Sequence, residues 1–300
     1  MELYIGSVRF FKHLILFLIL IIVISLMTVT IVLSAENNVL KEKKEINPDL
    51  ALDISDYDSG NVKSYAVAAE KFSLSYQELY PDLYMNRSTK VSETTEKTIY
   101  LTFDDGPSPN TLVILDTLDR HDIKATFFVI YYNDEASKKI YREIVKRGHT
   151  IAVHTASHKY KQIYKSIEAY LNDFDLIFNH IKQVTGVKPN LFRFPGGSIN
   201  PYNICFYQEL IAEMLRRGFT YYDWNVNGGD TASHATCDSI YTNVVEQVKK
   251  HDISVVLLHD SSSKDATATA LERIIVDLQK SGYNFKKLDG SVIPITFSYD

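Results

Sequence analysis

The chain has 300 residues, and its hydrophobic fraction of 45% is ordinary for a protein that buries a core in one large domain or two smaller ones. Its net charge of -5 gives no reason to expect nucleic acid as a partner, since phosphate backbones are bound by basic surfaces. Two cysteines, Cys205 and Cys237, exclude a disulfide framework, although sequence alone leaves open whether they form one bridge.

Residues 14–33 form an uncharged run that is long enough to cross a membrane as a helix. Arg9 and Lys12 precede it, so the positive-inside rule keeps residues 1–13 in the cytoplasm and sends the rest of the chain out. The alternative is a signal peptide that is cleaved near Ala35 to give a secreted protein. Because the apolar run is longer than a typical signal peptide core, we predict an uncleaved single-pass signal-anchor.

Residues 34–96 are polar, charged and rich in Ser and Thr, which predicts an extracellular stalk or linker. Its tyrosines, among them Tyr76 and Tyr80, are interpreted as side chains that pack on the following domain. That domain is predicted to span residues 97–290, and residues 291–300 are expected to form a C-terminal tail.

Within residues 97–290, short apolar runs alternate with helix-like segments. The predicted strands are 99–103, 125–130, 150–153, 191–193, 220–222, 254–258 and 283–286, and the predicted helices are 111–121, 137–147, 166–185, 206–217, 239–251 and 267–281. Alternation with short connections requires parallel strands joined by right-handed crossovers. The pattern therefore predicts an α/β fold, a distorted (β/α) barrel of about seven parallel strands.

Asp104 and Asp105 stand at the end of the first predicted strand, where Gly106-Pro107 forces a turn. Ligands of α/β proteins bind at the carboxyl ends of the strands. An isolated Asp-Asp pair before Gly-Pro is more often a solvated turn, so the interpretation depends on what ends the other strands.

His154 and His158 follow the third predicted strand. Histidines at i and i+4 lie on one face of a helical turn, from which both imidazoles can reach one metal ion. The pair is a weak signal alone. A carboxylate from another strand end, Asp105, would add a third ligand and leave positions open for water, as a catalytic metal requires.

The remaining strand ends also carry functional side chains. Arg193 and the turn 195–197 follow the fourth strand, so that a fixed positive charge stands beside backbone amides. Asp223-Trp224 follows the fifth strand, and His259 follows the sixth. Polar clusters at so many strand ends predict one shared site.

These residues resemble a known family. The motifs Thr102–Pro107, His154-x-x-x-His158, Arg193-x-Pro195, Asp223-Trp224 and Leu257-x-His259 match, in order and spacing, those of the polysaccharide deacetylases, also called the NodB homology domain or carbohydrate esterase family 4. Within this family, the chain resembles membrane-anchored peptidoglycan N-acetylglucosamine deacetylases. It implies a distorted (β/α) barrel and a divalent metal, zinc or alternatively cobalt, held by Asp105, His154 and His158.

The resemblance also implies the catalytic roles. Asp104 becomes the general base and Arg193 pairs with it, which is expected to hold the pKa of Asp104 low. His259 becomes the general acid, and Asp223 is expected to orient it and to support its protonated form.

For the substrate, the resemblance implies contacts with Trp224 and Leu257, which would line a small pocket for the acetyl methyl group, and with Pro195 and Gly196. Many members of the family carry a bulkier residue where this chain has Gly196, so the shape of the site near this residue stays open.

The predicted function is metal-dependent removal of N-acetyl groups from N-acetylglucosamine residues of a cell-surface polysaccharide, foremost peptidoglycan. An O-acetyl esterase acting on a polymer such as acetylated xylan and a chitooligosaccharide deacetylase are the alternatives on the same scaffold. An iron oxygenase also uses two histidines and a carboxylate, but the chain offers no place for a second cofactor. A wall-binding module without activity is disfavoured because every catalytic position is filled. No protein partner is implied.

Overall fold

The computed structural model describes residues 74–86 and 97–298. The predicted signal-anchor at 14–33, the cytoplasmic residues 1–13 and most of the predicted stalk lie outside the described residues. Within the part that is described, no helix is long and apolar enough to cross a membrane.

The secondary structure alternates as the sequence predicted. The strands are β1 (Thr98–Asp104), β2 (Thr126–Ile130), β3 (Thr150–Thr155), β4 (Leu191–Phe192), β5 (Thr220–Tyr221), β6 (Val226–Asn227), β7 (Ile253–His259) and β8 (Asn284–Lys286). The helices are η2 (Ser75–Gln77), α3 (Pro109–Arg120), α4 (Glu135–Lys146), α5 (Tyr160–Ile163), α6 (Ile167–Thr185), α7 (Tyr207–Arg216), α8 (Cys237–Val248) and α9 (Asp265–Lys280). The sequence analysis missed β6, because Val226 is a single apolar residue between Asn225 and Asn227 and so forms no apolar run.

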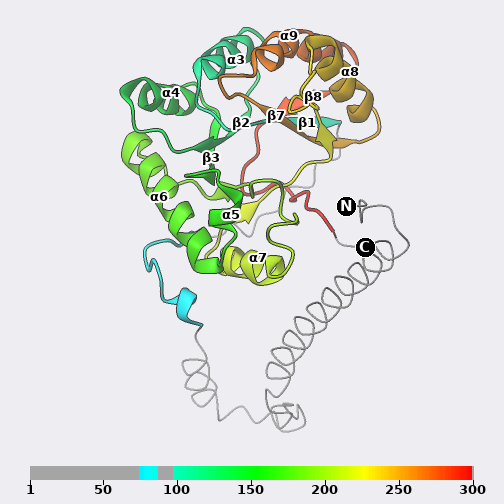
Figure 1. Ribbon diagram of the computed structural model, residues 1–300. Coiled ribbons are helices and arrows are strands. Elements are labelled where there is room, and N and C mark those ends of the chain that lie inside the picture. The colour runs from blue at the N-terminus through cyan, green and yellow to red at the C-terminus, as the bar shows by residue number, and fades with distance from the viewer. Residues whose placement is uncertain (1–73, 87–96, 299–300) are drawn as a thin grey trace, which may run out of the picture. The chain divides into compact units, whose positions relative to one another are not determined.

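The strands form one parallel sheet in the order β5-β4-β3-β2-β1-β7-β6, and β8 pairs with the beginning of β1. The sheet curls into a half-barrel whose outer face is covered by the long helices (Figure 1). The predicted parallel α/β fold is therefore confirmed, in the form of a barrel that stays open between β5 and β6.

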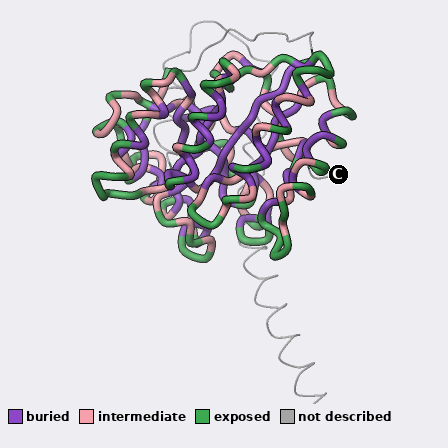
Figure 2. The backbone as a smooth tube through the Cα atoms, turned by 90° about the horizontal axis from the view of Figure 1, so that it is seen from above, coloured by how far each residue is buried: buried purple, intermediate pink, exposed green. Residues whose placement is uncertain are grey.

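Side chains of the sheet alternate between two apolar clusters. On β1, Ile99, Leu101 and Phe103 face the helices, whereas Tyr100 faces the interior of the half-barrel together with Phe128 of β2. Figure 2 shows the buried residues along the inner strands and the exposed ones on the outer turns. The same alternation of period two places Asp104 on the inner face, two residues beyond Thr102.

The C-terminal segment 288–298, drawn towards the red end of the colour scale in Figure 1, packs into this interior. The N–H of Leu288 donates to Thr126 Oγ1 at the beginning of β2. Further on, the Tyr222 hydroxyl donates to the carbonyls of Asp289 and Val292. The sequence analysis treated residues from 291 onward as a tail, but Val292 is buried in the inner cluster, so this segment belongs to the half-barrel.

Residues 74–86 of the predicted stalk also pack on the domain. Arg217 is fully buried at the end of α7, where its Nε donates to Glu213 Oε1 at 2.6 Å. Its two Nη atoms donate to the backbone carbonyls of Tyr76, Leu79, Tyr80 and Leu83. Tyr76 and Tyr80 contact the core, as the sequence predicted.

Cys205 and Cys237 are both free thiols.

Candidate active site

The site contains a buried ion pair between Arg193 and Asp104. Arg193, which follows β4, is fully buried, and its Nη1 donates to Asp104 Oδ1 at 2.9 Å. Nη1 also donates to Thr102 Oγ1, while Nε and Nη2 donate to the carbonyls of Tyr222 and Asp223. Each of the three guanidinium nitrogens thus donates at least one hydrogen bond, which a buried cation requires.

The pKa of Asp104 differs from the sequence expectation. Burial raises the pKa of this carboxyl, and the Arg193 guanidinium opposes that rise without overcoming it. The prediction that Arg193 holds the pKa low was wrong, because it did not count the cost of charging a carboxyl that is only 2% exposed. A raised pKa makes Asp104 a stronger proton acceptor, which suits a general base.

Next to this pair, Asp105, His154 and His158 form a cluster whose ligand atoms all lie within 4.8 Å of one another. Asp105 Oδ1 lies 3.5 Å from His154 Nε2 and 3.2 Å from His158 Nε2. His154 Nδ1 donates to the carbonyl of Arg193 at 2.9 Å, which fixes the tautomer and leaves Nε2 with its lone pair. Burial lowers the pKa of His154 to about 3, so the ring is neutral at physiological pH.

This cluster fits a divalent metal. Asp105 Oδ1 is buried and receives no hydrogen bond from the described residues, which is costly for a carboxylate oxygen unless a cation occupies the space beside it. Two imidazole nitrogens and one carboxylate oxygen are a donor set that zinc accepts, and the second bond of His154 is typical of a metal-bound histidine.

The turn that carries the histidines is not the helical turn predicted from their spacing. His154 belongs to β3, and the chain then turns back through His158, whose φ is +52°. Asp105 likewise has a φ of +72°. Residues with side chains rarely adopt this left-handed region, so the surrounding structure must hold both ligands in place.

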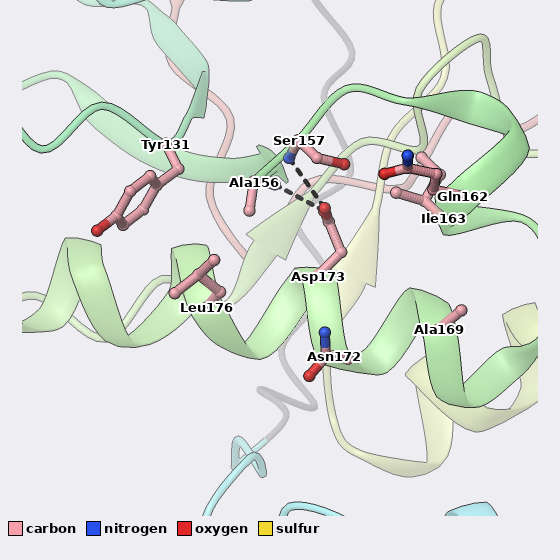
Figure 3. A pocket seen from close by; sticks show the side chains of 9 residues that line it. All are labelled: Tyr131, Ala156, Ser157, Gln162, Ile163, Ala169, Asn172, Asp173 and Leu176. Atoms are coloured by element: carbon pink, nitrogen blue, oxygen red, sulfur yellow. Dashed lines mark hydrogen bonds between the residues drawn. The ribbon is translucent and has the colours of Figure 1, made fainter.

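Asp173 on α6 holds this turn. Its Oδ1 accepts hydrogen bonds from the Thr155 hydroxyl and from the N–H of Ala156, and its Oδ2 accepts from the N–H of Ser157 at 2.9 Å. Figure 3 shows the Asp173 carboxylate below the turn. Asp173 also lines a cavity of about 450 Å³. No pattern in the sequence indicated this role, because Asp173 lies within a helical segment and is separated along the chain from every strand end.

His259 faces Asp104 across two neighbouring strands, because β1 and β7 pair Asp104 with His259. Its partner is Asp230: His259 Nδ1 donates to Asp230 Oδ1 at 2.8 Å, and the His259 N–H donates to Oδ2 at 2.7 Å. Burial alone would lower the pKa of His259, but the hydrogen bond and the charge of Asp230 outweigh it, and the pKa is raised. Conversely, burial would raise the pKa of Asp230, but its bonds to His259 leave it lowered.

The prediction that Asp223 orients His259 was therefore wrong. The Asp223 carboxylate accepts from the N–H and hydroxyl of Ser198 and from the N–H of Phe297. Asp230 was missed because it lies in the loop after β6, a strand that leaves no recognisable pattern, whereas Asp223 directly follows a readable strand.

The predicted substrate contacts are close by. Leu257 is buried on the inner face of β7, opposite Thr102 of β1, and Trp224 is half-buried. Pro195 is buried, and Gly196 is exposed with a φ of +77°. A Cβ at Gly196 would lie 2.8 Å from the Tyr160 ring, so in this chain a tyrosine from α5 occupies the space beside the glycine.

Gly106 is required for a different reason. A Cβ at this position would lie 2.2 Å from Asp260 Oδ2, inside the carboxyl group. Asp260 is itself buried and accepts a hydrogen bond from Thr111 Oγ1, and burial raises its pKa to about 7. Close packing against Asp260 therefore requires glycine after the two aspartates.

Comparisons with known proteins agree with this geometry. Residues 91–215 match the family model described as polysaccharide deacetylase. The chain is 30% identical to a putative polysaccharide deacetylase, YheN, of Bacillus subtilis, over 75% of this chain and 79% of that protein. It is also 30% identical to a peptidoglycan-N-acetylglucosamine deacetylase of Bacillus cereus, over 78% and 86% of the two chains.

Among solved structures, the catalytic domain of a peptidoglycan N-acetylglucosamine deacetylase from Eubacterium rectale is similar. The TM-score is 0.66 with 38% sequence identity, and the match covers 71% of this chain and 97% of the other.

The contacts of Asp173 predict a role in metal affinity. Asp173→Asn replaces one acceptor by a donor and should loosen the turn, raising the metal dissociation constant about 10- to 100-fold, as measured by competition with a chromophoric chelator. Asp175→Asn on the same helix is the matched control, because Asp175 bonds only to Asn179 among the side chains of the described residues. Equal metal affinity in the two variants would contradict this role.

The contacts of Asp230 predict a pH effect. Because Asp230 raises the pKa of His259, Asp230→Asn should lower it, and the alkaline limb of the pH–rate profile, where His259 loses its proton, should move to lower pH. Asp223→Asn should leave the pKa of His259 in place, as followed by NMR titration of the ring. A shift of the His259 pKa in Asp223→Asn but not in Asp230→Asn would reverse the assignment.

Proposed function

The chain belongs to the polysaccharide deacetylase family, and we propose that it removes N-acetyl groups from the N-acetylglucosamine residues of peptidoglycan. Members of this family are hydrolases, so the reaction class follows from membership. The observation that carries the proposal is the pairing of Asp104 with His259 on neighbouring strands, directly beside the cluster of Asp105, His154 and His158.

Hydrolysis of an amide requires a base to activate water and an acid to protonate the poor amine leaving group. Asp104 is the proposed base: its Oδ1 is held by Arg193, and its raised pKa favours proton uptake. Arg193 orients the carboxylate and compensates its charge, so that Asp104 is held in one position while it accepts the proton from water.

His259 is the proposed acid. Asp230 holds the proton on Nδ1 and raises the pKa of the ring, so that Nε2–H is available to the departing nitrogen near neutral pH. The carboxylate on one strand and the imidazole on the next thus divide the two proton transfers, each worth about 10²–10⁴-fold in rate.

Asp105, His154 and His158 would hold the metal, which we propose to be zinc, with cobalt as an alternative. When bound, such an ion polarises the carbonyl and acidifies water, which contributes several kcal/mol of transition-state stabilisation. The chain keeps His154 neutral for this purpose through burial and through its bond to the Arg193 carbonyl.

The choice of polymer depends on location. We propose that residues 14–33, which lie outside the described residues, anchor the chain with its catalytic domain outside the cell, where peptidoglycan is the N-acetylated polymer nearest to a bacterial membrane. The relatives named as peptidoglycan-N-acetylglucosamine deacetylases support this choice. An O-acetyl esterase would use the same groups, and the products distinguish the two.

The test is product analysis. Full-length protein, purified in detergent and loaded with zinc, is incubated with peptidoglycan, with N-acetylglucosamine oligomers and with acetylated xylan. We expect acetate and new primary amine in equal amounts from peptidoglycan. Acetate from xylan, with no amine from either N-acetylated substrate, would replace the deacetylase by an esterase.

The acid role of His259 predicts a selective loss. His259→Ala should slow amide cleavage by about 10²–10⁴-fold but affect an activated acetyl ester far less, because the ester's leaving group departs without a proton. Asp104→Asn should slow both, because both reactions need activated water. If His259→Ala loses the same factor on both substrates, His259 is not the acid.

A further inference from the structure

The C-terminal segment reaches the edge of the sheet that carries the site. The carbonyl of Ile295 accepts the N–H of Asp223 at 2.8 Å, and the N–H of Phe297 donates to Asp223 Oδ2 at 2.8 Å. Asp223 follows β5, so these bonds fasten the segment at the carboxyl end of a strand. Asp223 also binds Ser198, and so joins the segment to the turn that follows Arg193.

The ring of Phe297 lies against Trp224, a predicted substrate contact, and against Gly197 in the turn that follows Arg193. It meets the Trp224 ring edge-on, with centroids 4.8 Å apart, and a Cβ at Gly197 would lie 2.4 Å from Phe297 Cε2. The Trp224 ring in turn lies 5.7 Å from the Arg193 guanidinium, which holds Asp104. Phe297 is therefore only two contacts away from the guanidinium that holds the proposed base.

Phe297 and Trp224 both keep part of their surface exposed, unlike Leu288 and Val292 earlier in the segment, which are 0% and 9% exposed. If the segment served only to fill the half-barrel, it could end at its buried residues. Instead it continues to an aromatic ring that is partly exposed to solvent and packs against Trp224. An aromatic ring in this position suits the C–H face of a sugar, because that face is apolar while the hydroxyl groups point outward around it.

We propose that Phe297 packs against a sugar ring of the polysaccharide substrate and extends the apolar surface that begins at Trp224. The inference rests on the proposed function, since it assigns a contact to the polymer of that reaction. Contacts away from the reacting bond position a polymer at the site, and they are absent when the substrate is a small acetyl ester. The contribution of Phe297 should therefore depend on the length of the substrate.

The experiment compares three variants of the full-length, zinc-loaded protein. Phe297→Ala removes the ring, Phe297→Tyr retains it, and Ile293→Ala is the matched control, because Ile293 is 55% exposed on the same segment. Each is assayed on N-acetylglucosamine oligomers of increasing length and on a small activated acetyl ester. Thermal unfolding shows whether the variants remain folded.

We expect Phe297→Ala to raise KM for the longer oligomers about threefold to tenfold, with kcat on the ester unchanged, and Phe297→Tyr and Ile293→Ala to behave as wild type. An unchanged KM in Phe297→Ala, or an equal loss on ester and oligomers, would overturn the sugar contact while leaving the proposed function intact. Wild-type protein that cleaves the ester but no oligomer would overturn the proposed function, and the sugar contact with it.

Discussion

The buried guanidinium of Arg193 determines how the residues of the site are arranged. Burying the charge of Arg193 is tolerable only if its nitrogens are hydrogen-bonded, and the acceptors are Asp104 and the Thr102 hydroxyl on β1 and the carbonyls of Tyr222 and Asp223 after β5. Its planar face lies over the ring of Phe128, with the guanidinium carbon 4.3 Å from the ring centroid. The ends of three strands are thereby held in one fixed relation before any substrate arrives.

The adjacent aspartates take different roles because of this arrangement. Asp104 stays on the inner face, where the alternation of β1 carries it to the guanidinium. Asp105 leaves the strand in a left-handed conformation, which turns its carboxylate towards His154 and His158. Because His154 also bonds to the carbonyl of Arg193, a metal ligand and the proposed general base are both held by the same arginine. A substitution of Arg193 would therefore disturb both.

Much of this could be predicted from the sequence, because the signals are local. Apolar runs and short connections indicated the parallel sheet, and the residues that end strands pointed to the Asp105, His154 and His158 cluster. The residues that could not be predicted act through packing between segments that are distant in the sequence. Asp230 follows β6, which contains only one apolar residue, and Asp173 acts from the side of a helix. No local pattern distinguishes such residues from solvated ones.

The C-terminal segment also determines when the interior of the half-barrel can be filled during synthesis. Residues 288–298 leave the ribosome after every strand of the described sheet has emerged. Until then the interior lacks Leu288 and Val292, and the N–H of Asp223 lacks the carbonyl of Ile295 that accepts it in the finished fold. A nascent chain that had reached only residue 287 would contain the three proposed metal ligands and both proton-transfer groups. The interior of its half-barrel would still lack the side chains of Leu288 and Val292. The interior of the half-barrel is thus completed only after the catalytic residues have been synthesised, because it waits for the chain that follows β8.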